Sequence, residues 1–296
     1  MAGRQEDPTF YRRRVRGALR KAREARGLTQ RQAAEALDWS LSKIVRIEAG
    51  AVGVSTTDLR ALLDLYKIND ESKVAALVEL ARASKRRPWF TKYQEVLSPA
   101  FGHYLGYESA ASSIRAFEPL AVMGLLQTND YARAILQAIG ASRIDERSEL
   151  RAARQEIFDH PDCPDMLFVL DEAALRRRVG GAGVMRGQLR HLLTAMEHPK
   201  ISLQVVPFAV GAHPAMPGSF TILEFPEWDE DVLYQETAEG SITTREHGDR
   251  IAKYRAAFDQ LQDISLPTEK TKELIEISIR DLNDDVEDPV GGRHVP

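Results

Sequence analysis

The sequence predicts an all-α N-terminal domain followed by an α+β C-terminal domain. Three observations lead to this prediction. The chain of 296 residues has the length of about two domains. Residues 9–84 repeat apolar side chains at helical spacing and contain no alternating strand pattern. Beyond residue 95, short apolar or alternating runs of strand length lie between helical stretches.

The break between the two parts lies at Lys85 to Pro88, where the helical pattern stops and an aromatic stretch follows. We therefore place the domain boundaries from this break and from the composition of the C-terminus. The prediction is an all-helical domain at 9–85, a linker at 86–95, an α+β domain at 96–283 and a disordered tail at 284–296.

The charge of the chain is divided between these parts. The whole sequence has 40 Lys and Arg and 44 Asp and Glu, for a net charge of −4. Residues 1–93 hold 20 basic and 11 acidic side chains, net +9, which leaves residues 94–296 at net −13. Such asymmetry indicates a nucleic-acid-facing part joined to an acidic part.

Composition excludes several classes of protein. With 43% hydrophobic residues and a mean hydropathy of −0.34, the chain is expected to be soluble and to bury a real core. No apolar run is long enough to predict a membrane span, and the N-terminus lacks the apolar region of a secretory signal. The single cysteine, Cys163, excludes an internal disulfide and a four-cysteine zinc site. We expect a cytoplasmic protein.

The first helix is expected to begin near residue 9. Val15, Ala18, Leu19 and Ala22 share one apolar face of it, and Gly27 supplies its C-terminal stop. The same helix carries a basic cluster, expected to add salt-sensitive attraction to nucleic acid. The cluster consists of Arg12, Arg13, Arg14, Arg16, Arg20, Lys21 and Arg23.

Capping residues mark the helices that follow. Thr29 is a good N-cap for a helix over 30–37, and Ser40 for a helix over 41–49 that Gly50 closes. Ser55 and Asp70 open a fourth and a fifth helix. The spacing places two short capped helices on either side of a tight turn.

This pair of helices has the pattern of a helix-turn-helix. Ala33 and Leu37 on the first helix can meet Ile44 and Ile47 on the second, and the small Ala34 allows close approach. Such packing holds the second helix so that it projects from the surface of the domain. A helix held this way enters the major groove of DNA, where its N-terminal residues meet base edges.

The spacing also assigns roles on the second helix. Leu41, Ser42 and Arg46 are expected on its outward face; Arg46 is placed for bidentate contact with guanine and Leu41 for a thymine methyl. Lys43 and Gln30 are placed for phosphate contacts. The predicted DNA-binding set is Gln30, Arg31, Ser40, Leu41, Ser42, Lys43 and Arg46.

A basic run alone more often marks a solvated helical face than a DNA-binding one. Here the caps, the turn length, the apolar positions and the charge agree, so DNA binding is favoured. The stretch resembles the Xre and lambda-repressor class of helix-turn-helix. The matching residues are Leu28, Thr29, Gln30, Ala33, Ala34, Leu37, Ser40, Ser42, Ile44, Arg46, Ile47, Glu48 and Gly50.

The sequence departs from this class at Asp38 and Trp39, where Gly and an aliphatic residue are usual. Trp39 is expected to fill the same apolar position, while Asp38 makes the turn less easily formed. The resemblance implies that Glu48 helps to hold the second helix rather than reading DNA. It also implies a lambda-repressor-like fold for the N-terminal domain.

The second domain mixes both periodicities. Met166 to Leu170 is an apolar run of strand length, and Ile201 to Val206 alternates like a strand. Two further strands are expected at 219–225 and 231–235. Helices are expected at 129–137, 143–158, 184–197, 245–262 and 268–282.

Candidate chemical groups in this domain are scattered, and a structural interpretation is favoured for each. The glycines at 180–183 before a helix suit a plain turn better than a phosphate loop, because no Lys-Ser/Thr follows. His160 and Cys163 supply no complete metal-ligand set. Ser219 and His213 lack a nucleophile elbow. Asp171, Glu172 and the arginines at 176–178 form either a charged pocket or, as we favour, a solvated helix start.

A set of short sequence segments along this domain is more informative about its family than any single residue. It includes 117–119, 124–128 with 131–133, 170–175, 179–181, 188–189, 204–208, 211–214, 220–225 and 235–237. Together they resemble a large group of actinobacterial regulators that join an Xre-type N-terminal domain to a C-terminal domain of unknown function. These regulators are often described as antitoxin-like. The resemblance covers about residues 9–283, with Met123 standing where Pro is expected. It implies a gene regulator, sometimes with a small partner protein.

These observations predict a DNA-binding transcription regulator. We expect a homodimer on double-stranded DNA, with a C-terminal domain that binds a partner protein or a small ligand. No catalytic residue, cofactor or metal ligand is predicted, and the protein is not expected to be an enzyme.

Two alternatives stay open. An antitoxin-like protein would use the acidic domain to neutralise a small basic partner, although the same charge also serves solubility. An enzyme targeted to DNA would place two close, buried acids in a deep cleft, with Asp171, Glu172, Glu224 and Glu236 as the available acids. A flat apolar patch would instead favour a partner surface.

Overall fold

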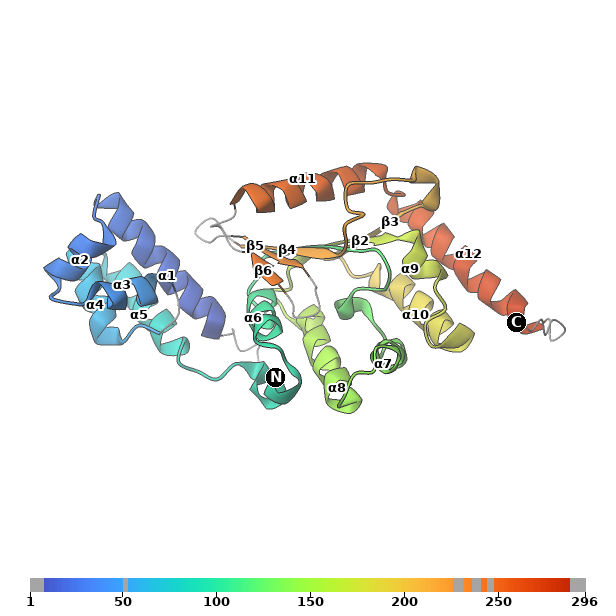
Figure 1. Ribbon diagram of the computed structural model, residues 1–296, viewed down its shortest axis with the longest axis horizontal. Coiled ribbons are helices and arrows are strands. Elements are labelled where there is room, and N and C mark those ends of the chain that lie inside the picture. The colour runs from blue at the N-terminus through green and yellow to red at the C-terminus, as the bar shows by residue number, and fades with distance from the viewer. Residues whose placement is uncertain (1–7, 50–52, 226–230, 236–240, 244–247, 288–296) are drawn as a thin grey trace.

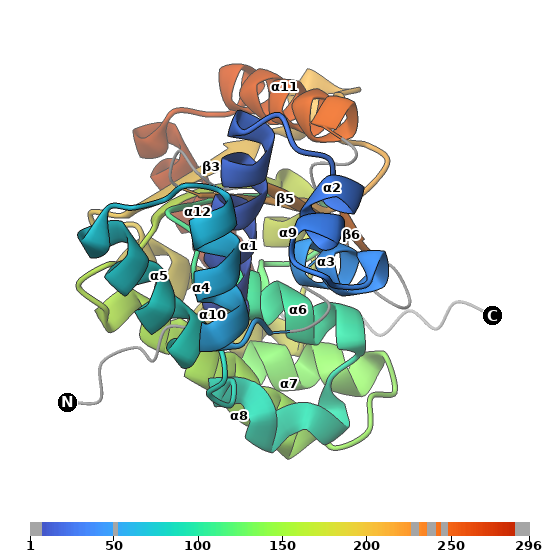
Figure 2. The ribbon, with the colours of Figure 1, turned by 90° about the vertical axis from the view of Figure 1, so that its left-hand side faces the viewer.

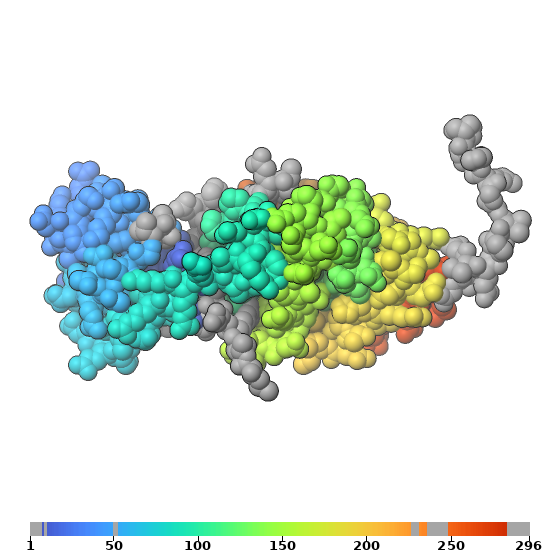
Figure 3. Space-filling model, turned by 90° about the horizontal axis from the view of Figure 1, so that it is seen from below, coloured from blue at the N-terminus to red at the C-terminus, as the bar shows by residue number. Residues whose placement is uncertain are grey.

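In the computed structural model, the described residues are 8–49, 53–225, 231–235, 241–243 and 248–287. The chain forms an all-helical region followed by a mixed α/β domain, as the sequence predicts (Figure 1). The helical region lies at one end of an elongated molecule, which is also evident from below in Figure 3.

Five helices make up the N-terminal region, and their predicted caps are confirmed. They are α1 (Pro8–Ala25), α2 (Gln30–Ala36), α3 (Leu41–Glu48), α4 (Thr56–Leu65) and α5 (Glu71–Ala83). The side chains of Thr29, Ser40, Ser55 and Asp70 each accept a backbone N–H at the start of the helix that follows. The predicted stop at Gly50 lies outside the described residues.

One hydrophobic core joins these helices. Leu19 and Leu59 are fully buried in it. Ala33, Ile44 and Ile47, which were predicted to meet, are buried members of the same core, and Leu37 packs against it. Its buried members are Val15, Leu19, Ala33, Ala34, Ile44, Ile47, Val54, Leu59, Leu62, Leu63, Tyr66, Val78 and Ala81. This core contains no residue of the α/β domain, so the helical region packs around its own interior.

The linker predicted at 86–95 is instead largely a 3-10 helix, η1 (Trp89–Val96). Tyr93 and Val96 are buried in the core of the α/β domain, and Trp89 and Phe90 pack against that core. The Trp89 indole N–H donates to Ser109 Oγ at 3.0 Å. Aromatic burial therefore attaches this segment to the second domain, which the local Lys-Arg-Arg-Pro sequence does not reveal.

The sheet of the second domain has the strand order β3-β2-β1-β4-β5-β6 among the described residues. Its members are β1 (Ser113–Glu118), β2 (Asp165–Asp171), β3 (Ile201–Val206), β4 (Phe220–Glu224), β5 (Val232–Gln235) and β6 (Ser241–Thr243). The first three strands are parallel, with Ile114 opposite Met166, and β4, β5 and β6 pair antiparallel. The sheet is therefore mixed.

Helices cover both faces of this sheet (Figure 1). One face, with Phe168 and Leu203, packs against α6 (Pro99–Glu108), α7 (Asn129–Ala138), α8 (Ile144–Gln155), α10 (Gly181–Ala195) and α12 (Thr268–Glu287). The opposite face, with Phe117 and Phe220, packs against α11 (Gly248–Ile264). Short helices η2 (Gly124–Leu126), η3 (Glu156–Asp159), α9 (Glu172–Arg176) and η4 (Phe208–Val210) complete the connections.

The four predicted strands are confirmed, but the central strand β1 and the short β6 are not among the sequence predictions. The helix expected from residue 184 begins at Gly181, so the glycine stretch is its first turn rather than a loop. Gly180 precedes it in a left-handed conformation, φ +69°. The tail predicted from residue 284 is also wrong at its start, because α12 continues to Glu287; residues 288–296 lie outside the described part.

The two parts of the molecule meet where α1 lies against α6 (Figures 1 and 2). Arg13 of α1 is 4% exposed, and its guanidinium carbon lies 4.1 Å from the ring centre of Phe225 and 5.1 Å from that of Tyr107. A cation held between two aromatic faces stabilises this contact.

Candidate nucleic-acid interface

The short helix α3 divides its side chains cleanly between core and surface. Ile44, Ile47 and Glu48 are buried on the inner face. Leu41 and Val45 are 39% and 40% exposed, although both are large and apolar. The exposed residues 41, 42, 45, 46 and 49 recur at the spacing of one helical face. The outward face of α3 is therefore available to an external partner.

A buried ion pair fixes α3 to the rest of the region. Both carboxylate oxygens of Glu48 accept from the Arg23 guanidinium, at 2.7 and 2.9 Å. Gln30 donates from Nε2 to the same carboxylate at 2.9 Å, so Glu48 joins α1, α2 and α3. The hydrogen bond to Glu48 raises the pKa of Arg23, and burial beside Glu48 raises the pKa of Tyr66 to about 12.

The turn between α2 and α3 requires an uncommon backbone conformation. Asp38 has φ +53°, in the left-handed region where glycine is favoured. Trp39 then packs against the hydrophobic core, in the role predicted for it. The tight turn therefore forms with Asp in place of the usual glycine.

Lys43 lies on the flank of α3 that faces α4, rather than on the outward face. Its ammonium group is 2.8 Å from Asp58 Oδ1 and 3.6 Å from the ring centre of Trp39. Any phosphate that Lys43 binds would compete with Asp58 for the same ammonium. Lys43 therefore supports the packing of α3 as well as adding charge near it.

The other predicted DNA-binding residues are distributed over the same end of the domain. Arg31 is exposed on α2, and Arg46 is exposed on α3 with Nε donating to the carbonyl of Ser42 at 3.3 Å. Ser40 caps α3 by accepting from the Lys43 amide, and Ser42 is exposed beside it. The prediction omitted Val45, which the spacing of four residues from Leu41 would have identified.

The basic cluster of α1 is not uniformly a charged surface. Arg13 and Arg23 are 4% and 8% exposed, and they serve the contact with the second domain and the Glu48 ion pair. Arg12 donates to the carbonyl of Ser84 at 3.1 Å. The expectation that the whole cluster attracts nucleic acid is therefore wrong, because part of it is used in packing.

The candidate groups of the second domain have structural partners. Asp171 caps α9 by accepting from the Ala173 amide at 2.8 Å, and Glu172 accepts from Arg176 at 3.0 Å. These contacts fit the helix-start interpretation. Nε2 of His213 lies 3.5 Å from Oδ2 of Asp171. Among the described residues, no group of three or more His, Cys, Asp or Glu side chains is arranged to hold a metal.

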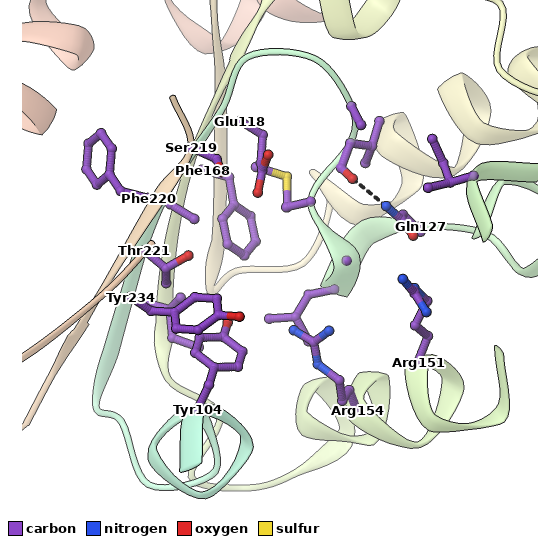
Figure 4. Close-up of a pocket in the computed structure, with 18 of the residues that line it drawn as sticks. Tyr104, Glu118, Gln127, Arg151, Arg154, Phe168, Ser219, Phe220, Thr221 and Tyr234 are labelled. Carbon is purple, nitrogen blue, oxygen red and sulfur yellow. Dashed lines mark hydrogen bonds between the residues drawn. The ribbon is translucent and has the colours of Figure 1, made fainter. Parts of the chain in front are cut away.

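The second domain contains a cavity of about 210 Å³ between the sheet and helices α6, α7 and α8 (Figure 4). Glu118 is the one acid among the described residues that line it. Glu108 lies behind this wall and binds Arg154 through two hydrogen bonds of 2.9 and 2.7 Å.

Comparison with known families assigns both parts of the chain. Residues 101–277, more than half of the chain, match the family described as a domain of unknown function, DUF5753. The chain belongs to the DUF5753 family. Residues 15–77 match a helix-turn-helix domain, a type of domain that binds DNA. No curated protein and no solved structure matches this member of the family.

The helix-turn-helix match begins within α1 and ends within α5, and the DUF5753 match contains the sheet and its cavity. Within the described part of this DUF5753 protein, none of the helices has the length and apolar character needed to cross a bilayer.

Proposed function

We propose that this protein is a sequence-specific transcription regulator that reads DNA with α3. The observation that carries the proposal is the outward face of α3, where Leu41, Ser42, Val45 and Arg46 are exposed on a helix held by the buried Glu48 ion pair. A rigid support is what direct readout needs, because base contacts depend on a fixed helix position.

In this proposal each residue has a distinct task. Arg46 binds guanine O6 and N7 from the major groove, and Leu41 contacts a thymine methyl. Arg31, Gln30 and Lys43 contact phosphates near the start of α2 and the side of α3, together with the amides after Thr29. Ser40 and Ser42 complete the contact set at the N-terminus of α3.

The experiment is selection of DNA sites from a random pool by the full-length chain, followed by affinity measurements on the selected site. Arg46→Ala should weaken binding about tenfold or more and relax selectivity at a single base pair. Arg60→Ala, on the exposed surface of α4, is the matched control. Equal behaviour of the two variants would show that Arg46 does not read DNA.

Phosphate contacts are tested by the salt dependence of the same binding. Arg31→Ala should weaken binding to all sequences and lower the salt slope by about one. Lys43→Ala should do the same, and its unfolding must be measured alongside because Lys43 also contacts Asp58 and Trp39. An unchanged slope in both variants would remove these residues from the interface.

We further infer that the regulator acts in the cytoplasm as a homodimer on a palindromic or repeated site, as expected for this type of reader. Two half-sites about one helical turn of DNA apart, or a multiple of it, are the expected result of the selection. Light scattering of the free protein and of the complex measures the stoichiometry. A single half-site bound by one chain would rule out the dimer.

The C-terminal domain is proposed to act by binding, either a small ligand or a partner protein. The resemblance to actinobacterial antitoxin-like regulators and the net charge of −13 over residues 94–296 favour a basic protein as the partner in the second case. Co-expression with the product of the adjacent gene, at low salt, tests that case.

A further inference from the structure

The cavity of the DUF5753 domain lies over a row of side chains that crosses the middle of the sheet. Phe168, Ala116, Thr221 and Tyr234 are neighbours in register on β2, β1, β4 and β5. All four line the cavity, so they share one face of the sheet. The two central side chains are small, and the two outer ones are large and aromatic. The sheet therefore has a hollow above Ala116 and Thr221, with an aromatic side chain on either side of it.

Helical segments close this hollow without filling it. Tyr104 of α6 lies against Tyr234, with ring centres 4.5 Å apart. Gly124 of η2 also lines the cavity and adds no side chain to it. The space between the sheet and the helices is seen in Figure 4. Ile139 lines the cavity and is 70% exposed, so a small molecule can enter from the surface beside it.

Size restricts what the cavity can hold. A cavity of about 150 Å³ holds benzene. The observed volume of about 210 Å³ is therefore sufficient for a single ring with one or two short substituents. It is smaller than the pockets of roughly 300 to 1,000 Å³ that take drug-sized ligands. The ligand that fits this space is a molecule with one ring.

The charged side chains in the cavity wall are already engaged within the protein. The guanidinium of Arg154 donates to both carboxylate oxygens of Glu108, at 2.9 and 2.7 Å. Arg151 donates to the carbonyl of Arg147 at 3.2 Å, and both Arg151 and Glu118 interact with further groups of the chain. A charged ligand would lose its hydration here without gaining a free counter-charge. The cavity therefore favours an uncharged ligand.

The chain at β4 brings hydroxyl groups to the cavity. Thr221 is 9% exposed, and Figure 4 shows its hydroxyl directed toward the space beside Phe168 and Tyr234. Ser219, two residues earlier, lines the same cavity. A hydroxyl group both donates and accepts, so a single hydroxyl group on a ligand can pair with Thr221. The flanking aromatic side chains favour an aromatic ring, which can stack on them or meet them edge to face.

We propose that this cavity binds a small phenol, an uncharged molecule with one aromatic ring and one hydroxyl group. The ring lies over Ala116, between Phe168 and Tyr234, and the hydroxyl group pairs with the hydroxyl of Thr221. The inference rests on the proposed binding role of the C-terminal domain and names the chemical class of its ligand. Its test needs no DNA and does not depend on the reading of bases by α3.

The test is isothermal titration calorimetry of the full-length protein with four probes that share a methylated benzene ring. The probe p-cresol carries a hydroxyl group, toluene has no polar group, 4-methylbenzoate is an anion and 4-methylbenzylamine is a cation at neutral pH. We expect p-cresol to bind most tightly, toluene about threefold more weakly and each ionic probe at least tenfold more weakly. No binding of p-cresol at millimolar concentration, or equally tight binding of an ionic probe, would overturn the proposal.

A variant of nearly equal shape tests the hydroxyl contact. Thr221→Val should weaken p-cresol about threefold and leave toluene unchanged, because only p-cresol loses a hydrogen bond. A merely structural effect of the substitution would weaken both probes alike. Thr194→Val, on the exposed surface of α10 and outside the cavity wall, is the matched control. Equal affinities of the two variants for p-cresol would show that Thr221 does not bind the ligand.

A filling variant tests the location independently. Ala116→Leu should abolish binding of p-cresol and toluene, and the smaller Ala116→Val should weaken both; circular dichroism and the unfolding midpoint show that each chain folds. Ala252→Leu, exposed on α11 across the sheet, is the control. Retained binding in folded Ala116→Leu would place the ligand elsewhere and overturn the proposal. Because these measurements contain no DNA and no partner protein, their failure would leave the site-selection and co-expression results intact.

Discussion

At the residue scale, Glu48 organises the DNA-binding region although it does not face outward. It binds Arg23 of α1 and Gln30 of α2 through a single buried carboxylate. The resemblance implied a supporting role for Glu48, but the sequence did not identify Arg23 as its partner. Arg23 stands among other arginines of α1, and 25 residues separate it from Glu48. Only folding of α1 against α3 selects it from that cluster.

Glu48→Gln is expected to destabilise the helix-turn-helix region by roughly 3 kcal/mol, because it leaves the Arg23 guanidinium buried without its counter-charge. Urea unfolding followed through tryptophan fluorescence measures this change, and DNA affinity should fall in parallel. Glu35→Gln on the exposed surface of α2 is the control and should change stability by less than about 0.5 kcal/mol. Similar costs for both variants would argue against a structural ion pair.

At the scale of elements, helices α1 to α5 follow their local sequence closely. Caps and apolar spacing act over three or four residues, so Thr29, Ser40, Ser55 and Asp70 could be located without the tertiary structure. Strand β1 was missed because Ala116 and Arg115 have weak strand preference. It becomes a strand through pairing with β2 on one side and β4 on the other.

The turn between α2 and α3 provides a test at this scale. Asp38→Gly is expected to stabilise the region by about 0.5 kcal/mol, because glycine adopts the observed positive φ without a Cβ contact. Asp38→Val should destabilise it by more than about 1 kcal/mol, since a β-branched residue is poorly tolerated there. Thermal unfolding of the two variants measures the order of their stabilities, and Asp38→Asn is a near-neutral control. The reverse order would mean that this turn is not left-handed.

At the scale of the whole molecule, the two parts are joined by more than the chain connection. Arg13 of α1 lies over Tyr107 of α6 and Phe225 after β4, and α6 also supplies Tyr104 and Phe101 to the cavity wall. One face of α6 thus borders the cavity and another contacts the helix-turn-helix region. Figures 1 and 2 show this helix between the two parts.

Arg13→Ala is expected to loosen this junction, since it removes a buried cation from two aromatic faces. Amide hydrogen exchange of the full-length protein should become at least several-fold faster in α6 and in the first half of α1. Arg14→Ala, at the neighbouring exposed position, should leave the exchange of α6 unchanged. Unaltered exchange in the Arg13 variant would show that the parts are held together by other contacts.

The sequence by itself determined the fold class, the five N-terminal helices and the outward side chains Leu41, Ser42 and Arg46, because these depend on contacts within a few residues. The tertiary structure decided which charges are used in packing, since Arg13, Arg23 and Lys43 find partners far along the chain. It also decided the cavity, whose wall joins residues of β1 and α8 that lie far apart in the sequence. Local pattern sets the elements, but only packing brings distant side chains to one place.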